Sequence, residues 1–206
     1  MKENFAIMTD AGGDFTREII AKYGIEETPI STVVWPDGSE RPTDLYWDTM
    51  KPDEYFALMN NKKNNFASSI PSPQTMIDRL SALAEAGRNV VVFTISSSMS
   101  GGFSAFTVAA NEVMEKYPNI QIVVIDSLRY SAALTLLAVE ASLCREKEMS
   151  FDDTVTYLKV ALLILMRLFC DIWLDRASAE NESSVEYMAS SSATLSGVFL
   201  MEFIRT

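Results

Sequence analysis

The sequence predicts an α/β fold: a three-layer α/β/α arrangement around a mainly parallel sheet. First, strand and helix signals alternate over the first two-thirds of the 206 residues. Second, the strands expected at 89–95 and 120–125 are apolar along their length, as strands buried on both faces are. Third, a helix signal lies between them, which is the crossover that parallel neighbours need.

The first elements follow from local pattern. Phe5–Met8 is a short apolar strand, and Thr16–Tyr23 has apolar residues at helical spacing before a stop at Gly24. Thr28–Trp35 is rich in β-branched residues and ends at a Pro-Asp-Gly turn, so it is expected to be a strand. A helix is expected over Lys51–Asn60.

The polar segment from 60 to 73 has two prolines and no periodicity, which predicts a loop. Beyond it the pattern is regular. The remaining expected elements are a helix at 74–86, a strand at 89–95, a turn at 96–102, a helix at 102–117, a strand at 120–125, and helices at 130–147 and 151–169.

Composition excludes several classes of function. The formal net charge of −11 disfavours nucleic acid and anionic membrane surfaces as partners. The most apolar stretch, Val160–Cys170, is too short to span a membrane and contains Arg167, so no membrane span is expected. The absence of histidine removes Ser-His-Asp triads and imidazole metal sites. No metal, cofactor or catalytic residue is predicted.

The cysteines and the N-terminal sequence indicate the cellular compartment in which the protein is expected. Cys144 and Cys170 form no CxxC pair, and two isolated thiols suit a reducing cytoplasm. The N-terminus has no apolar run of signal-peptide length. The chain is therefore expected to be cytoplasmic.

Three loops are expected to meet at the carboxyl ends of the strands, where open α/β sheets usually bind ligands: 9–14, 96–102 and 126–131. Asp10 and Asp126 could contact a ligand there, although stabilising their own turns is the commoner role. Asp14 is expected to cap the helix that begins at Thr16.

The segment TISSSMSGG is the strongest candidate site. Ser96, Ser97, Ser98 and Ser100 offer hydroxyl donors, and the helix that begins near Gly101 offers unpaired backbone N–H groups. Together they would stabilise a small anion such as a carboxylate. The alternative is that one serine caps the helix and the others are solvated.

Two further groups of residues can each be interpreted in two ways. Ser68 and Ser69, in ASSIPSP, could hold a ligand, but by themselves they fit an ordinary loop that ends in the helix cap Ser72 before Pro73. An aromatic set could line a pocket, but side chains at such spacing are more often core: Trp35, Tyr46, Trp47, Tyr55 and Phe56.

The chain resembles the DegV family of fatty-acid-binding proteins. The resemblance rests on an ordered set of segments: MTDAGGDF, KYGIEETPISTVVWPDG, SSIPSP, TISSSMSGGFSAFTVAA and VVIDSLRYSA. The sequence departs from the family pattern at Ala11, Ile70 and Gly102, where the family usually has Ser, Gln and Thr.

The resemblance implies a non-enzymatic bacterial carrier for a long-chain fatty acid, which presents the acyl carboxylate to a fatty-acid kinase. Ser68 and Ser97 take the places of the family residues that contact the carboxylate. Their neighbours Ser69, Ser98, Ser100 and Gly101 would support them.

The resemblance also suggests a division at residue 168. Residues 1–168 match the N-terminal α/β domain of the family, whereas 169–206 form an atypical tail without the Gly-Gly-Arg segment and the histidine expected further on. A frameshift, a truncation or a divergent end would each explain that tail. Two alternatives to a carrier stay open: an enzyme or binder acting on another small anionic substrate at the same strand ends, or a truncated, oligomerising domain without ligand.

Overall fold

The computed structural model describes residues 5–26 and 28–162. Its main sheet has three parallel strands in the order β1-β5-β6: β1 (Ala6–Thr9), β5 (Val90–Thr94) and β6 (Ile122–Asp126). Ala6 pairs with Val90, which pairs in turn with Ile122. β5 lies in the centre and all five of its residues are buried, as its apolar run predicts.

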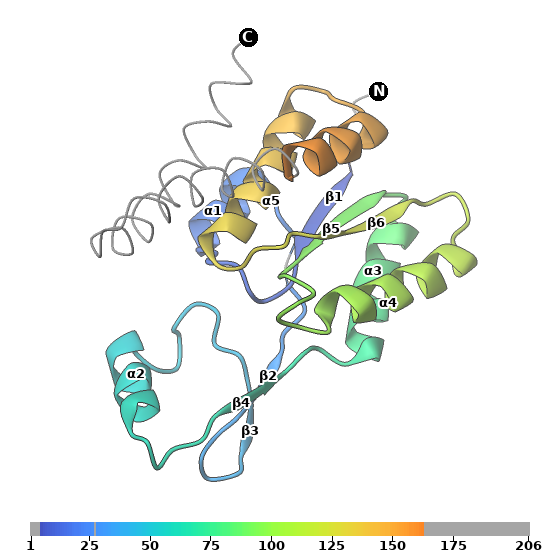
Figure 1. Cartoon of the computed structure of the whole chain (residues 1–206). Coiled ribbons are helices and arrows are strands. Elements are labelled where there is room, and N and C mark those ends of the chain that lie inside the picture. Colours follow the sequence, from blue (N-terminus) through green and yellow to red (C-terminus); the bar gives the residue numbers. More distant parts are fainter. Residues whose placement is uncertain (1–4, 27, 163–206) are drawn as a thin grey trace, which may run out of the picture.

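Helices cover both faces of this sheet (Figure 1). α3 (Pro73–Glu85) and α4 (Gly102–Lys116) pack on the face to which Met8 and Val92 point. α5 (Ala132–Glu146) and the helical residues 151–162 pack on the other face, against Ile7 and Phe93. α1 (Arg17–Tyr23) also borders that second core. Because alternate strand residues face opposite layers, the predicted three-layer α/β/α fold is confirmed.

The helix ends follow their capping residues. Thr16 Oγ1 accepts the Ile19 N–H at 3.2 Å, and α1 ends at Gly24 with φ +55°, which favours glycine. The expected cap at Asp14 is wrong: its carboxylate instead accepts a hydrogen bond from the Ser131 hydroxyl. Thr16 is the residue that immediately precedes the helix, so its side chain reaches the free N–H groups.

A second, antiparallel sheet lies below the main sheet in Figure 1. It consists of β2 (Thr32–Val34), β3 (Glu40–Pro42) and β4 (Ala67–Ser69) in the order β3-β2-β4. The loop expected over 60–73 is therefore wrong at 67–69. The three residues of β4 are exposed and too few to show periodicity, and only their pairing with β2 makes them a strand.

α2 (Pro52–Asn60) stands beside the small sheet and has no buried residue. The core interpretation of the aromatic set is also wrong, because each of its five members is partly or fully exposed. The rings pack on one another instead, with Trp47 5.6 Å from Tyr55 and 5.9 Å from Phe56 between ring centroids. This small unit therefore has aromatic contacts but no closed core.

Several expectations concern the rest of the chain. The proposed division at residue 168, the tail 169–206 and Cys170 lie outside the described residues, whereas Cys144 is buried in α5. Within the described part, no helix is both long and apolar enough to cross a bilayer. The domain division and the cytoplasmic location stay predictions.

Candidate functional site

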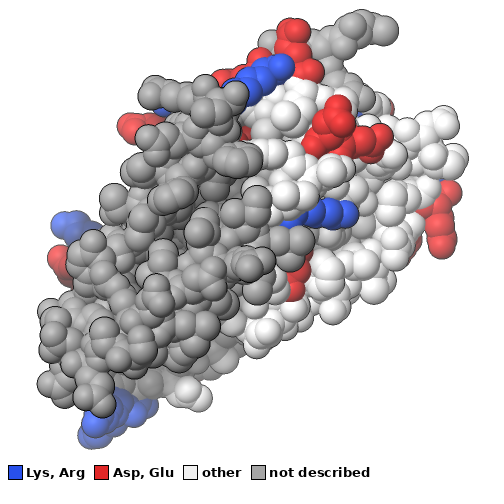
Figure 2. Space-filling view, turned by 45° about the horizontal axis from the view of Figure 1, so that its top comes forward, with Lys and Arg blue, Asp and Glu red and all other residues white. Residues whose placement is uncertain are grey.

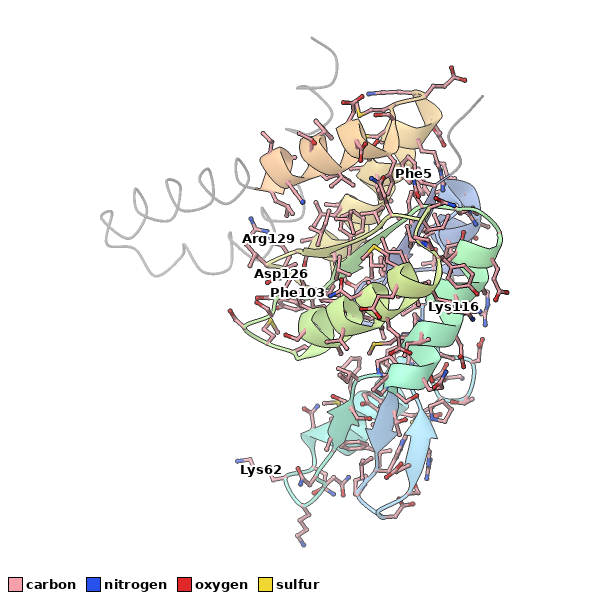
Figure 3. All side chains as sticks on the ribbon, turned by 90° about the vertical axis from the view of Figure 1, so that its right-hand side faces the viewer. Phe5, Lys62, Phe103, Lys116, Asp126 and Arg129 are labelled. Atoms are coloured by element: carbon pink, nitrogen blue, oxygen red, sulfur yellow. The ribbon has the colours of Figure 1, made fainter. Side chains whose placement is uncertain are left out.

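The three loops at the carboxyl ends of β1, β5 and β6 meet, as the sequence predicts. The Ser131 N–H donates to Gly12 O at 2.7 Å, which joins the third loop to the first. The Ser96 N–H donates to Arg129 O at 2.8 Å, which joins the second loop to the third. Figure 3 shows Asp126 and Arg129 beside the start of α4, where Phe103 is labelled. The loops thus form one continuous edge.

Asp10 is the buried polar group at the centre of this edge, with 7% of its surface exposed. Its Oδ2 accepts the Ile95 N–H at 2.7 Å and its Oδ1 accepts the Gly12 N–H at 2.9 Å. Burial raises the pKa of Asp10, while the two backbone donors lower it. Because both oxygens are engaged within the chain, Asp10 stabilises its turn, the commoner of the two roles considered.

Gly12 is required where the first loop touches the second. A Cβ at this position would lie 2.1 Å from Ile95 Cγ2, closer than any real side chain permits. Glycine therefore lets the loop after β1 pass this near the end of β5 without displacing Ile95. The sequence shows the glycine but not its neighbour, so this close approach could not be predicted.

Asp126 holds the serine turn in place. The Ser97 N–H donates to Asp126 Oδ1 at 3.2 Å and to Oδ2 at 3.3 Å, and the Leu128 N–H donates to Oδ1 at 2.9 Å. The carboxylate therefore ties the end of β6 to the turn after β5. Its role within its own turn is as expected, and its contact with the neighbouring loop was not foreseen.

The serines of this turn fall into two groups. Ser96 Oγ accepts the Ser98 N–H at 3.3 Å, and Ser100 Oγ accepts the Gly102 N–H at 3.1 Å. By contrast, Ser97 and Ser98 are exposed, and neither hydroxyl has a hydrogen-bond partner within 5–26 or 28–162. Ser100 thus serves the helix start, and the other two hydroxyls remain available.

The start of α4 lies next to this turn. Gly101 is the residue before the helix, is exposed, and has no side chain that could cap it. Asp10 is also close, because a Cβ at Gly102 would lie 3.5 Å from Asp10 Oδ2. A carboxyl group of the chain itself therefore already lies beside the first turn of α4, where the helix dipole favours its ionised form.

Ser68 and Ser69 lie apart from the turn in the chain, on exposed β4. Ser68 pairs with Val33 and Ser69 with Thr32, so the two serines point to opposite faces of the small sheet. No hydrogen bond joins either of them to residues 96–101 in the described ranges. The bond pattern does not bring the two serine groups together, and their joint role stays a prediction.

The charges around the edge are mostly acidic and locally engaged. Asp10 and Asp126 each accept backbone N–H groups, and Asp14 accepts the Ser131 hydroxyl. Figure 2 shows acidic and basic side chains scattered over the described part of another face. In the described residues, no group of three or more Asp, Glu or Cys side chains is arranged to hold a metal ion. The groups that this edge presents to a ligand are therefore hydroxyl groups, which can form hydrogen bonds.

Sequence comparison relates the chain to proteins about twice its length. The family model described as "Uncharacterised protein, DegV family COG1307" matches residues 4–161. A DegV domain-containing protein of Streptococcus gordonii is 30% identical over 151 residues, covering 72% of this chain and 50% of that protein. One from Streptococcus pyogenes serotype M1 is 29% identical over 152 residues, covering 72% and 51%. The chain spans about half the length of these relatives.

Solved structures give the same relationship. A stearic-acid-binding protein from Eubacterium ventriosum has a TM-score of 0.67 at 25% identity, over 76% of this chain and 52% of that one. A Thermotoga maritima protein described as having a fatty-acid-binding function has a TM-score of 0.63 at 26% identity, over 78% and 55%. With a family model that matches most of its length, the chain belongs to the DegV family.

Proposed function

We propose that this chain binds a long-chain fatty acid and that it holds the acyl carboxylate with serine hydroxyls, without catalysing a reaction. The observation that carries this proposal is the state of Ser97. Its backbone is fixed by Asp126, while its exposed hydroxyl makes no hydrogen bond to any part of the chain that the structure describes. A hydroxyl group that is fixed in position and has no partner in the chain is suited to donate a hydrogen bond to a ligand carboxylate.

The relatives support the same chemistry. Similar solved structures include proteins described with stearic acid and with vaccenic acid. In the proposed complex, Ser97 and Ser68 donate to the carboxylate and Ser98 stands beside Ser97, whereas the side chain of Ser69 points to the opposite face of the small sheet. Ser100 contributes through the start of α4, because its hydroxyl oxygen already accepts the Gly102 N–H.

We propose that this edge binds its ligand and catalyses no reaction. The Asp126 carboxylate engages the backbone N–H of Ser97 and not its hydroxyl, so it is not placed as a base for that hydroxyl. Presentation of the bound acyl carboxylate to a fatty-acid kinase is the further part of the proposal. Turnover of an acyl or phosphate ester that disappears in Ser97→Ala would contradict the non-enzymatic assignment.

The first test is to extract the purified full chain with organic solvent and identify what is released by mass spectrometry. A fatty acid in stoichiometric amount supports the proposal. Titration of the delipidated chain with stearate then compares Ser97→Ala and Ser68→Ala with wild type. Loss of one charge-assisted hydrogen bond, about 1.5–3 kcal/mol, predicts roughly 10- to 150-fold weaker binding for each.

Ser81→Ala is the matched control, because Ser81 lies in α3, away from the strand-end loops. Its affinity should equal that of wild type. An empty extract together with no stearate binding would overturn the proposal. Equal affinities for Ser97→Ala and wild type would remove Ser97 from the site.

The kinase step has its own test. A fatty-acid kinase should be retained on immobilised chain loaded with stearate, and retention should fall on the delipidated chain. Equal retention on both forms would argue against presentation of the acyl carboxylate. Sedimentation of the same samples measures the oligomeric state, which stays a prediction.

A further inference from the structure

The loop that follows β6, residues 127–131, has an unusual backbone. Ser131 has φ +59° and ψ −137°, and Leu128, three residues earlier, has φ +52°. A positive φ brings the Cβ of an ordinary residue against its own backbone, so such conformations favour glycine. The Ser131 angles are close to those of the first central residue of a type II′ turn, where glycine is common. Two residues of this short loop are therefore held in conformations that cost free energy.

A strained conformation persists only where other contacts hold it, and Ser131 has such contacts on both sides. Its N–H donates to Gly12 O at 2.7 Å, and its hydroxyl donates to the Asp14 carboxylate. Thr135, one turn further along α5, donates its hydroxyl to Asp14 O at 3.1 Å. These bonds fasten the first strand-end loop to the start of α5. Glycine at position 131 would relieve the strain, but it has no hydroxyl for Asp14, so the presence of serine points to a role for its side chain.

The middle of the same loop contacts the serine turn. Arg129 O accepts the Ser96 N–H at 2.8 Å and the Ser127 hydroxyl at 3.1 Å. Ser127 is fully buried, and its oxygen also accepts the Arg129 N–H at 3.1 Å. Figure 3 shows Arg129 beside Asp126, whose carboxylate accepts the Ser97 N–H. The Arg129 carbonyl group is therefore fixed from within its own loop and supports the residue that precedes Ser97.

We propose that Ser131 is a positioning residue of the fatty-acid site, an inference that rests on the proposed function. The bonds of Ser131 to the first loop hold residues 127–131 in their strained conformation, in which Arg129 O accepts the Ser96 N–H. When these bonds are lost, the loop relaxes, and the serine turn keeps its contact with Asp126 but loses its contact with Arg129. Ser131 acts through the loops and is not proposed to touch the ligand.

Two substitutions separate the hydroxyl group from the backbone strain. Ser131→Ala removes the hydroxyl and keeps the strain, whereas Ser131→Gly removes both. Ser131→Gly should therefore have the higher melting temperature of the two, the reverse of the usual order of glycine and alanine. Both variants should nevertheless bind stearate about 5-fold more weakly than wild type, the effect of one lost hydrogen bond. Stability that is regained without affinity is the signature of a positioning role.

Hydrogen exchange followed by NMR reports on the serine turn directly and needs no ligand. The Ser96 N–H should exchange faster with solvent in both Ser131 variants than in wild type, because the relaxed loop no longer holds its acceptor in place. If either variant fails to fold, as judged by circular dichroism, Asp14→Ala takes its place. That substitution removes the acceptor of the Ser131 hydroxyl and should give the same faster exchange and weaker binding.

Ser150→Ala is the matched control, because it removes a similar contact elsewhere. The Ser150 hydroxyl donates to the Asp153 carboxylate at 2.7 Å and accepts the Asp153 N–H at 3.1 Å, beyond the end of α5 that is remote from Ser131. The substitution should lower the melting temperature. It should leave the stearate affinity and the exchange of the Ser96 N–H as they are in wild type.

The outcomes separate this inference from the proposed function. Wild-type affinity in both Ser131 variants, together with weaker binding by Ser97→Ala, would overturn the positioning role and leave the carboxylate site standing. An affinity that follows the melting temperature, so that Ser131→Gly regains what Ser131→Ala loses, would also overturn it. If the wild-type chain binds no stearate, the proposed function fails, and unchanged exchange of the Ser96 N–H would then overturn the role of Ser131 as well.

Discussion

The Ser97 backbone N–H points at the carboxylate of Asp126, 3.2 Å from Oδ1 and 3.3 Å from Oδ2, so a residue at the end of β6 fixes the turn that follows β5. The same carboxylate accepts the Leu128 N–H at 2.9 Å. Ser97 therefore owes its position to the neighbouring strand as much as to its own loop.

Replacement of Asp126 tests this dependence. Asp126→Ala removes the acceptor of both N–H groups and should lower the free energy of unfolding by about 1–3 kcal/mol, because hydrogen bonds to a charged group are lost. Urea denaturation measures the change. Asp126→Asn keeps one carbonyl oxygen and should lie between the alanine variant and wild type. Equal stability of all three proteins would show that the contact contributes nothing.

Gly12 gives a sharper steric prediction. Gly12→Ala should destabilise the chain by about 1–3 kcal/mol or more, because the new Cβ would lie 2.1 Å from Ile95 Cγ2. Ile95→Ala in the same chain removes that methyl group, so the double variant should lose less stability than the sum of the two single variants. Thermal unfolding of all four proteins completes the cycle.

Gly101→Ala is the matched control for that experiment. Gly101 has a φ of −72°, and a Cβ there would meet nothing within 4 Å. The substitution should therefore change stability by no more than about 0.5 kcal/mol. A similar loss at both glycines would contradict the steric account.

Arg145 of α5 connects three backbone carbonyls from two other segments. It donates to Phe5 O at 2.9 Å, to Tyr23 O at 2.7 Å and to Gly24 O at 3.1 Å. The last two are at the end of α1, where helical carbonyls lack partners. Arg145→Met should lower the free energy of unfolding by about 3 kcal/mol in urea denaturation.

Arg41→Met is the comparison for Arg145. The ion pair of Arg41 with Asp37 is exposed, with 46% and 61% of the two side chains accessible. Its loss should cost at most about 1 kcal/mol. If the two variants lost equal stability, the carbonyl contacts of Arg145 would not be its main contribution.

The buried carboxyl group of Glu140 is expected to make the stability of the fold depend on pH. Burial raises its pKa above the ordinary 4.5 and outweighs the opposite effects of the Tyr157 hydrogen bond, at 3.0 Å, and of Lys147. Between pH 4.5 and the raised pKa, the folded chain therefore keeps a proton on Glu140 that the unfolded chain has released. Stability due to this group is greatest below pH 4.5 and falls as pH rises through the raised pKa.

Glu140→Gln removes that titration and keeps an oxygen for the Tyr157 hydroxyl. The difference in unfolding free energy, variant minus wild type, should increase from pH 4.5 upward and then level off. Urea denaturation of both proteins at intervals from pH 4.5 to 8 measures it. Asp10, whose pKa burial also raises, is present in both chains and cancels in the difference. Parallel curves would show that Glu140 does not titrate differently on folding.

The main sheet could be predicted from the sequence, whereas the small sheet could not. The β5 residues form a continuous buried run, so their pattern alone indicates a central strand. β3 and β4 have three exposed residues each, and their strand character arises from pairing with β2. Such pairing between distant segments leaves no local signal. Of the strand expected over Thr28–Trp35, the structure has β2 at Thr32–Val34 only, and its partners β3 and β4 could not be predicted for the same reason.

The position of the candidate site could be predicted from the sequence, whereas the arrangement of its side chains could not. Parallel topology places the three loops at one edge, and small residues mark them. Which serine hydroxyls remain available depends on contacts between loops: Ser100 serves the Gly102 N–H, whereas Ser97 is held by its backbone. The aromatic set was assigned to the core because ring spacing does not distinguish a buried core from a partly exposed aromatic cluster.

The backbone hydrogen bonds that join Gly12 to Ser131 and Ser96 to Arg129 have a consequence for affinity. Ordering a flexible residue costs about 1–2 kcal/mol of conformational entropy, and loops that become ordered on binding reduce affinity by that amount. Here the loops are immobilised by one another through main-chain bonds that do not involve the serine hydroxyls. The edge is thus preorganised, and different side chains could change its ligand without rebuilding its frame.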